Sequence, residues 1–376
     1  MRIGLDARAI RDHFPGIARY VYNLARALPA QLDGDRLALL INADQPTSRY
    51  DLAALGRLPG VEVVTLAAPP LSLREHVELP LAARRLRLDA LHAPYYVRPY
   101  AMPVPVVTTL YDVTPTRYPE YLPSRRARAA YDAMTHLALG TSAALLTLSA
   151  SARDDLVALY KARPERITVT PPAADPAFAP RPAPEIACLR ERLALPEAYV
   201  LYVGINKPHK NLPRLVEAFS EVARAMPDVA LVLAGRPDPR YPEAETRIRE
   251  SGLTARVRLL SDVAEADLAA LYSGAAVFAF PSLYEGFGFP VLEAMACGAP
   301  VVASRASSLP EVVGDAGVLV PASDSHALAQ AIIAVLQDGR LWTRLHQAGL
   351  ARAATFTWAR TAEQTLAVLR RVARRR

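Results

Sequence analysis

Two acidic side chains in the segment EGFGFPVLE have the spacing of a ligand-binding loop. Seven residues separate Glu285 from Glu293, so the two carboxylates would contact different parts of one elongated ligand. Glycines after Glu285 let a ligand approach the backbone closely and leave amide donors exposed where a helix begins. Nothing structural requires an acid at position 285, whereas Glu293 could also serve as an ordinary helix-capping acid. The turn between them consists of Gly286, Phe287 and Gly288.

A second loop, GINKPHKN, is basic. Of 44 basic residues in the chain only three are lysines, and two of these, Lys207 and Lys210, lie in this loop. Gly204 ends the preceding strand, and a helix is expected from about Leu212. Amide groups and the helix dipole at that N-terminus favour an anion, and the two ammonium groups add charge. The loop therefore predicts an anion site, with two surface lysines in a turn as the structural alternative.

Two further loops follow strands of the N-terminal half. In HFPGIARY, Gly16 precedes a helix that would face the same ligand, although a plain turn explains it equally well. In TLYDVTP, Tyr111 and Asp112 directly follow the apolar strand VPVVTTL. We expect both to contact a substrate, and Asp112 could instead cap the next segment.

Metal and cofactor sites are not expected. The Asp33-Gly34-Asp35 sequence matches a metal-binding DxD pattern but is typical of a turn before a strand. Two cysteines exclude a Cys-based zinc site, and no Walker loop, GxGxxG or GxSxG segment occurs. The histidines considered show no metal-ligand spacing. They are His13, His76, His92 and His136.

Charge and hydropathy exclude several classes of protein. The 376 residues are 52% hydrophobic and 22% charged, as in a globular chain. The net charge of +7 includes five arginines in Arg370–Arg376, so the body carries only +2, and no nucleic-acid partner is expected. The tail and Arg125, Arg126 and Arg128 could touch anionic lipid head groups or be solvated helix ends. Without a signal peptide or membrane span, we expect a cytoplasmic protein, peripheral at most.

Short apolar runs alternate with amphipathic stretches, which predicts parallel sheets covered by helices. The expected strands are Arg2–Asp6, Arg36–Ile41, Val61–Leu66, Ala90–Ala93, Val104–Leu110, Leu145–Leu148, Ile167–Thr170, Tyr199–Val203, Ala230–Ala234, Val257–Leu260, Val277–Phe280, Val301–Ala303 and Val318–Val320. The expected helices are Gly16–Leu28, Leu71–Arg87, Pro123–Leu139, Ala150–Tyr160, Leu212–Met226, Ala264–Tyr272, Pro290–Ala296, Ser325–Gln337, Leu341–Ala354 and Trp358–Arg374.

A proline-rich stretch from Pro171 to Pro196 interrupts this alternation and is predicted to be an interdomain linker with at most a short helix. We therefore expect two α/β domains, residues 1–175 and 176–355, and a last helix, 356–376, that packs back toward the first domain. Ligands of open parallel sheets bind beyond the carboxyl ends of the strands, which is where the four loops lie.

The segment EGFGFPVLE resembles the E-x7-E motif of retaining glycosyltransferases of family 4, which have the GT-B fold of two facing Rossmann-like domains. PGIARY, LSASARDDL, VGINKPHKN and FTWARTAEQTL are similar to further segments of that family and occur in the family's order. The resemblance covers the whole chain. It implies an N-terminal acceptor-binding domain, a C-terminal domain that binds a nucleotide sugar, and a C-terminal crossing helix.

The resemblance also implies roles for individual residues. Glu293 would bind the ribose and Glu285 the transferred sugar, while Lys210 would bind the diphosphate. Two positions depart from the family pattern: Tyr111 stands where many members have histidine, and His209 replaces a common arginine, so Lys207 would supply the second cation. Gly16 would lie near the phosphates, Val263 near the base, and the amides of Gly286, Phe287 and Gly288 would hold the sugar and diphosphate.

By resemblance, the protein is expected to transfer a hexose from a nucleoside-diphosphate sugar to a glycan or glycolipid in surface polysaccharide synthesis, with retention and without a metal. GDP-mannose is the favoured donor, and glucose or a UDP-sugar is the alternative. Glu285, Lys210 and Asp112 would carry the catalysis. The competing hypotheses are a nucleotide-sugar epimerase of the same fold and a non-catalytic nucleotide-sugar-binding protein. A dehydrogenase lacks its glycine fingerprint here.

Overall fold

The computed structural model describes residues 1–12, 15–42, 47 and 49–374. Two compact units make up this part of the chain. The first combines Met1–Pro172 with Thr357–Arg376, and the second is Ala173–Phe356. The first unit is therefore built from both ends of the chain, and the second is inserted within it.

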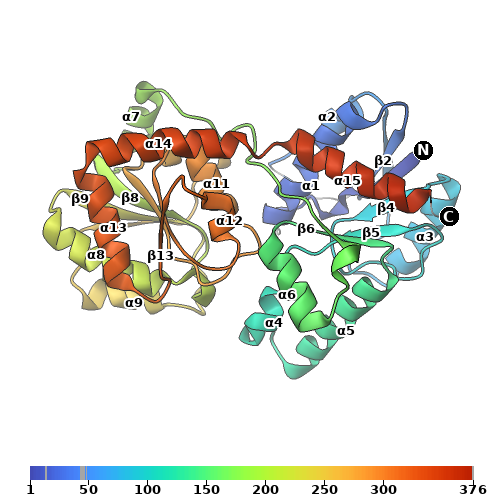
Figure 1. Cartoon of the computed structure of the whole chain (residues 1–376), viewed down its shortest axis with the longest axis horizontal. Coiled ribbons are helices and arrows are strands. Elements are labelled where there is room, and N and C mark those ends of the chain that lie inside the picture. The colour runs from blue at the N-terminus through green and yellow to red at the C-terminus, as the bar shows by residue number, and fades with distance from the viewer. Residues whose placement is uncertain (13–14, 43–46, 48, 375–376) are drawn as a thin grey trace. The chain divides into compact units, whose positions relative to one another are not determined.

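The first unit contains a seven-stranded parallel sheet in the order β3-β2-β1-β4-β5-β6-β7. Helices lie on both sides of this sheet (Figure 1). Its described strands are β1 (Arg2–Asp6), β2 (Arg36–Asn42), β3 (Val61–Leu66), β4 (Ala90–Ala93), β5 (Val106–Thr109), β6 (Ala144–Thr147) and β7 (Ile167–Val169). Its α-helices are α1 (Pro15–Ala27), α2 (Leu52–Gly56), α3 (Glu75–Arg85), α4 (Thr114–Arg117), α5 (Arg125–Thr141), α6 (Ala150–Tyr160) and α15 (Trp358–Ala373).

The second unit contains a six-stranded parallel sheet in the order β10-β9-β8-β11-β12-β13. Its strands are β8 (Ala198–Val203), β9 (Val229–Ala234), β10 (Val257–Leu260), β11 (Val277–Phe280), β12 (Val301–Ser304) and β13 (Val318–Val320). Its α-helices are α7 (Ala183–Arg192), α8 (Leu212–Ala225), α9 (Glu243–Glu250), α10 (Glu265–Ser273), α11 (Phe289–Ala296), α12 (Leu309–Val313), α13 (Ser325–Gln337) and α14 (Gly339–Ala354). The expected α/β class with two parallel sheets is confirmed.

The proline-rich stretch, for which the sequence allowed at most a short helix, includes one helix. It contains the ten-residue helix α7, which buries Leu189 in the second unit. Pro184 does not disrupt this helix, because it lies in the first turn, where a backbone N–H would have no intrahelical acceptor. The helix predicted from Leu71 begins only at Glu75, because Leu71 adopts a left-handed conformation with φ of 65°.

Helix α15 completes the core of the first unit. Its buried side chains include Ala362, Leu366 and Leu369, and Trp358 packs edge-on against Tyr20 with ring centroids 5.9 Å apart. The helix packs against α1 (Figure 1). Burial of this apolar stripe explains why a helix that follows the second unit in sequence belongs structurally to the first.

Candidate active site

In each sheet the first strand in the chain lies in the middle. The next two strands are added on one side of it and the later strands on the other, so the strand order reverses between two neighbouring strands. These pairs are β1 and β4 in the first unit, and β8 and β11 in the second. Ligands of doubly wound sheets bind at such switch points, beyond the carboxyl ends of the strands. In the second unit the loops at this point are residues 204–211 and 281–288, which are the two loops singled out by composition.

An ion pair joins these two loops. The Lys210 ammonium donates to both carboxylate oxygens of Glu285, at 2.7 and 2.9 Å, and the two side chains are only 15% and 11% exposed. The Ser282 hydroxyl donates to Glu285 Oε1 at 2.6 Å. Residues predicted separately as an anion-binding lysine and a sugar-binding acid therefore form one partly buried charged centre.

The histidine in the basic loop is neutral at physiological pH. His209 is buried, and its burial, reinforced by the charges of Lys210 and Lys207, lowers its pKa to about 3. His209 therefore cannot replace the cation of an arginine. Lys207 is half-buried in the same turn and remains the candidate for a second cation.

Three serines at the end of β12 and just after it hold the acidic loop, and the sequence analysis did not identify them. Ser307 accepts a hydrogen bond from the Glu285 amide at 2.7 Å and donates to the Glu285 carbonyl at 2.9 Å. Ser308 donates to the carbonyls of Glu285 and Phe287, and Ser304 donates to that of Ser282. The polar run SRASS, which begins at the last residue of a buried strand, was the signal that could have revealed this support.

The two glutamates have different surroundings. Glu293 lies on α11, is 2% exposed and accepts a hydrogen bond from the Tyr272 hydroxyl at 3.0 Å. Burial, with the nearby Glu293 carboxylate, raises the pKa of the Cys297 thiol to about 12. Glu293 is thus a buried acceptor fixed by a tyrosine, whereas Glu285 is part of an ion pair in a loop.

The turn before α11 needs its second glycine. Gly288 has φ of 106°, and a Cβ there would lie 2.8 Å from a Leu309 side-chain carbon. Phe287 is buried against Phe289 and Phe356, with ring centroids 5.4 and 5.8 Å away. The aromatic side chain therefore anchors the turn, and only the backbone of Gly286, Phe287 and Gly288 is suited to contact a ligand.

A cavity of about 190 Å³ lies at the ends of β8, β9 and β10. Gly204, Asn206 and Ser261 are among its lining residues, and Val263, predicted near a base, lies two residues beyond this lining. Asn206 ties two of the loops together, because its amide donates to the carbonyls of Asp238 and Tyr241. The cavity adjoins the basic loop through Gly204.

The residues predicted to contact an acceptor belong to the first unit. Tyr111 packs edge-on against Tyr20, with ring centroids 5.4 Å apart, and burial raises its pKa well above the usual value. Asp112 Oδ1 accepts a hydrogen bond from the Thr114 amide at 2.8 Å, next to the start of α4, whose N-cap residue is Val113. Gly16 is exposed in the first turn of α1, inside the helix rather than before it. His13, in the same loop, lies outside the described residues.

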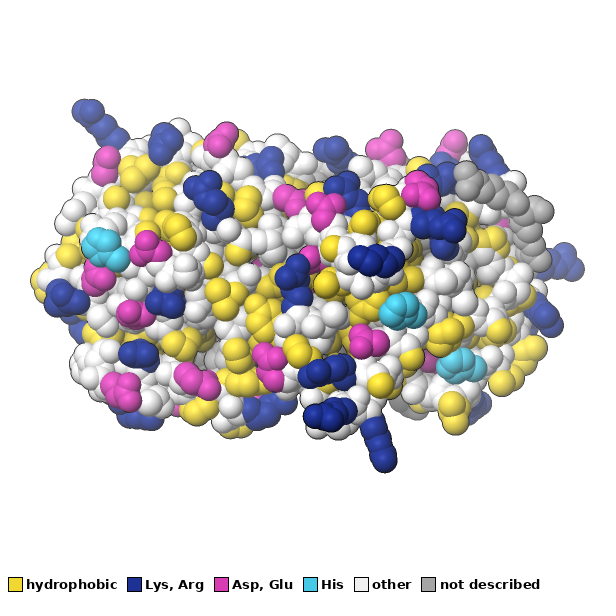
Figure 2. Space-filling model, turned by 60° about the horizontal axis from the view of Figure 1, so that its bottom comes forward, with side chains coloured by type: hydrophobic (Ala, Val, Ile, Leu, Met, Phe, Trp, Pro, Cys, Tyr) yellow, Lys and Arg dark blue, Asp and Glu magenta, His cyan; other side chains and the backbone are white. Residues whose placement is uncertain are grey.

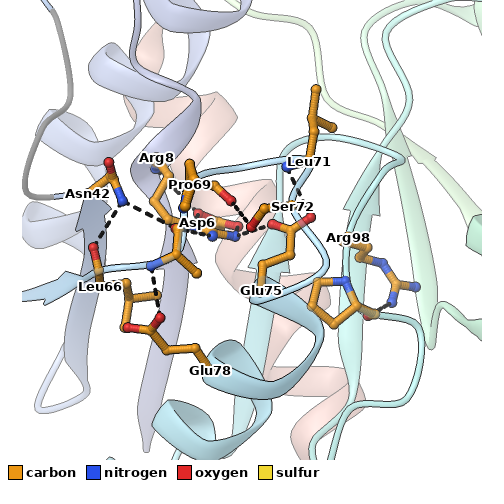
Figure 3. Close-up of polar contacts among 12 residues, drawn as sticks. Asp6, Arg8, Asn42, Leu66, Pro69, Leu71, Ser72, Glu75, Glu78 and Arg98 are labelled. Carbon is orange, nitrogen blue, oxygen red and sulfur yellow. Dashed lines mark hydrogen bonds and ion pairs between the residues drawn. The ribbon is translucent and has the colours of Figure 1, made fainter.

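The first unit has a second charged centre at its own switch point, which the sequence analysis did not identify. The Arg8 guanidinium lies between the carboxylates of Asp6 and Glu75 (Figure 3), at 2.7 and 3.0 Å. Arg8 is 1% exposed and also donates to the Ala68 carbonyl. These groups line a cavity of about 80 Å³ with Arg11 and Tyr95.

The expected turn at Asp33-Gly34-Asp35 has a structural role. Asp35 accepts hydrogen bonds from the Met1 amino group at 2.6 Å and from Arg370 Nε at 2.8 Å. Within the described ranges, no group of three or more His, Cys, Asp or Glu side chains is arranged to hold a metal ion.

Comparison with known proteins identifies the class of this fold. Sucrose-phosphate synthase from Thermosynechococcus elongatus superposes with a TM-score of 0.77 at 23% identity over 100% of both chains. Anabaena Alr3699/HepE, solved in complex with UDP and glucose, gives 0.74 at 22% identity over 98% of both chains. At these identities the likeness establishes the fold alone, which is the two-domain GT-B fold.

Sequence comparison then gives the family. Residues 197–338 match the model described as "Glycosyl transferases group 1", and residues 15–178 match "Glycosyltransferase Family 4". The O-antigen chain mannosyltransferase B of Escherichia coli is 32% identical over 97% of this chain and 98% of its own length. The chain belongs to glycosyltransferase family 4.

Proposed function

We propose that this glycosyltransferase moves a hexose, with mannose favoured over glucose, from a nucleoside-diphosphate sugar to a glycan or glycolipid acceptor of a surface polysaccharide, with retention at the anomeric carbon. Similarity over nearly the full length to an O-antigen mannosyltransferase supports the polysaccharide context and mannose as the transferred sugar. GDP-mannose is the proposed donor. The ion pair of Lys210 and Glu285 at the β8–β11 switch point carries the proposal, because it places a cation and a carboxylate together at a ligand-binding edge.

In the proposed reaction, the anomeric C–O bond of the donor breaks and an acceptor hydroxyl forms the new bond on the same face, giving up its proton to the leaving phosphate. Negative charge grows on the leaving nucleoside diphosphate. Lys210, aided by Lys207 and the amide groups before α11, would stabilise that charge, and such preorganised electrostatics usually form the largest catalytic contribution. Glu285 would bind the sugar hydroxyls and set the position of the anomeric carbon.

The ribose and the base would occupy the remaining part of the second unit. Glu293 would accept hydrogen bonds from ribose hydroxyls beside the one from Tyr272. The cavity bounded by Gly204 and Ser261 has the location and size to receive the base. Asp112 and Tyr111 remain the proposed acceptor contacts.

The test of this function is incubation of the protein with UDP- and GDP-sugars, with and without glycan acceptors. Acceptor-dependent release of GDP or UDP is expected. Epimerised donor without transfer would favour the epimerase, and binding without turnover would favour a nucleotide-sugar-binding protein. A thermal-shift panel of nucleotide sugars, with GDP-mannose expected to give the largest shift, would identify the donor.

Replacing Glu293 by glutamine should weaken both nucleoside-diphosphate and nucleotide-sugar binding by roughly ten- to a hundredfold. Hydrogen bonds to a charged acceptor contribute about 1.5–3 kcal/mol, and about 1.4 kcal/mol is tenfold in affinity. Calorimetry with GDP and UDP measures the effect. Tyr272→Phe removes only the hydroxyl that donates to the Glu293 carboxylate, so it should lower the nucleotide affinity less. Glu250→Gln is an exposed change in the same unit and should leave the nucleotide affinity unchanged. Unchanged affinity in Glu293→Gln would exclude the ribose role.

Activity should survive metal removal, because Lys210, Lys207 and the start of α11 supply the positive charge that a metal supplies elsewhere. The measurement is the initial transfer rate before and after treatment with EDTA, with Mn²⁺ and Mg²⁺ added back. Complete loss of activity that either ion restores would contradict this mechanism.

A further inference from the structure

The outward side of α3 carries an unusual cluster of exposed apolar side chains. Of the eleven large apolar residues exposed among the described residues, four lie between positions 71 and 81. Leu71 is 54% exposed, Leu73 91%, Val77 63% and Leu81 57%. The last three are spaced by four residues, so they share one side of the helix and its entry turn. We call these four residues the α3 apolar face.

The opposite side of α3 is also apolar and is already buried. Leu79, Ala82 and Ala83 are at most 4% exposed and belong to the hydrophobic core of the first unit. A helix that is apolar on both sides is normally covered on both sides, since exposed apolar patches mark interaction surfaces. The α3 apolar face therefore requires a partner other than the protein's own core.

The charges around this face are mainly positive, which favours an anionic partner. Between Leu71 and Arg87 there are four arginines against two glutamates. Arg74, Arg84, Arg85 and Arg87 are exposed. Figure 2 shows one face of the molecule, on which apolar side chains reach the surface among basic and acidic side chains.

The two glutamates of this segment are turned toward the protein. Glu75 is 1% exposed and pairs with Arg8. Glu78 accepts hydrogen bonds from the amides of Ala67 and Ala68 at 2.7 and 2.8 Å (Figure 3) and pairs with Arg74. The outer surface of α3 thus presents apolar groups flanked by cations, while its acids are used internally.

We propose that the α3 apolar face, with Arg84, Arg85 and Arg87 beside it, docks the protein on an anionic lipid surface. The leucine and valine side chains enter the boundary between head groups and acyl chains, and the arginines bind lipid phosphates. The proposal rests on the exposed side chains of α3 and does not depend on the identity of the donor or acceptor. No described helix is long and apolar enough to span a bilayer.

The docking surface adjoins the charged cavity of the first unit. Leu71 belongs to the α3 apolar face and also lines the cavity that contains Arg8 and Glu75. Its left-handed backbone is held by a hydrogen bond from its amide to Glu75 at 3.1 Å. An amphiphilic acceptor that is anchored in the bilayer would therefore reach this cavity from the lipid side.

One arginine of the C-terminal tail is held within the first unit, whereas Arg371 and Arg374 are exposed. Arg370 is bound to Asp35 and to the carbonyls of Gln31 and Leu32. That arginine stabilises the first unit, so its charge is not available to a membrane in the way an exposed arginine is. Arg84 and Arg85 are exposed at the end of α3.

The test is flotation of the full chain with vesicles of phosphatidylglycerol and phosphatidylcholine, compared with phosphatidylcholine alone. The full chain should bind the anionic vesicles. Val77→Ser/Leu81→Ser should lower the partition coefficient at least about tenfold, since burial of an aliphatic side chain contributes roughly 1.5–3 kcal/mol. Arg84→Gln/Arg85→Gln should lower it by roughly ten- to thirtyfold at low salt, at about 1 kcal/mol per arginine.

A matched control uses two other exposed leucines. Leu137 and Leu159, on α5 and α6, are 47% and 45% exposed, and Leu137→Ser/Leu159→Ser should leave binding unchanged. Equal loss in this control would overturn the proposal, because general surface hydrophobicity would then explain binding. If the full chain ignores anionic vesicles, the proposal is also wrong. In that case the oligomeric state of the full chain should be measured. A dimer that is dissociated by Val77→Ser/Leu81→Ser, but not by the control, would assign the α3 apolar face to contact with a second copy of the chain.

Discussion

Replacement of Lys210 by methionine is expected to lower turnover by roughly a hundred- to a thousandfold, the usual effect of removing one preorganised group that stabilises a developing anion. Lys210 is the cation at the β8–β11 switch point, and methionine keeps most of its length without the charge. Nucleoside-diphosphate affinity should fall as well. Initial transfer rates and calorimetry with GDP and UDP measure the two effects. Lys161→Met, an exposed change at the end of α6, is the matched control.

The ion pair makes this prediction sharper, because its two members should behave differently. Glu285→Gln removes the carboxylate that holds the Lys210 ammonium and so leaves the ammonium free for a diphosphate. Its diphosphate affinity should therefore not fall, while its turnover should fall, since a misplaced sugar loses interactions made only in the transition state. If Glu285→Gln weakens diphosphate binding and Lys210→Met does not, the assigned roles are reversed.

Gly235→Ala is expected to destabilise the second unit by roughly 2–4 kcal/mol, from overpacking together with left-handed backbone strain. Gly235 has φ of 152°, and a Cβ there would lie 2.0 Å from the carbonyl oxygen of Gly204, which lines the cavity at the ends of β8, β9 and β10. Since neither backbone segment can move without shifting a strand end, nucleotide affinity should fall too.

The measurement is urea unfolding of the full chain in a Trp358→Phe background, in which Trp342 of α14 is the one remaining tryptophan and reports on the second unit. Gly252→Ala is the control, because Gly252 also has positive φ, 67°, but no atom within 4 Å of the added Cβ. In this control the free energy of unfolding should fall by only about 1 kcal/mol. A similar loss in both variants would show that backbone strain, and not the contact with Gly204, accounts for the effect.

Much of the fold follows from sequence patterns that depend on burial. Buried parallel strands such as β11 and β12 are short, continuous apolar runs, and their ends were predicted to within one or two residues. Helix α9 was missed, because the segment EAETRIRE buries only Ala244 and Ile248 and shows little apolar periodicity. Helix α12 was missed as well, since a five-residue helix is too short to show a pattern.

The candidate site was predictable in its components but not in its contacts. Residue type and position after a strand indicated Lys210 and Glu285 individually, yet their pairing connects positions 75 residues apart. Asn211 illustrates the same limit: its amide donates to the carbonyls of Pro281 and Ala322, and so fixes the basic loop to two distant loops. Such long-range polar partners depend on sheet order, which local sequence does not encode.

The insertion of the second unit within the first has a consequence for synthesis on the ribosome. The second unit is contiguous in sequence, so all of its chain has been made before Thr357 appears. The first unit lacks α15 until then, and the surface that α15 covers on α1 and η2 (Leu28–Gln31) stays open. Domains generally fold as units during translation, the earliest first. Here the domain that begins the chain is the last to close, and its unfinished core must be protected throughout the synthesis of its neighbour.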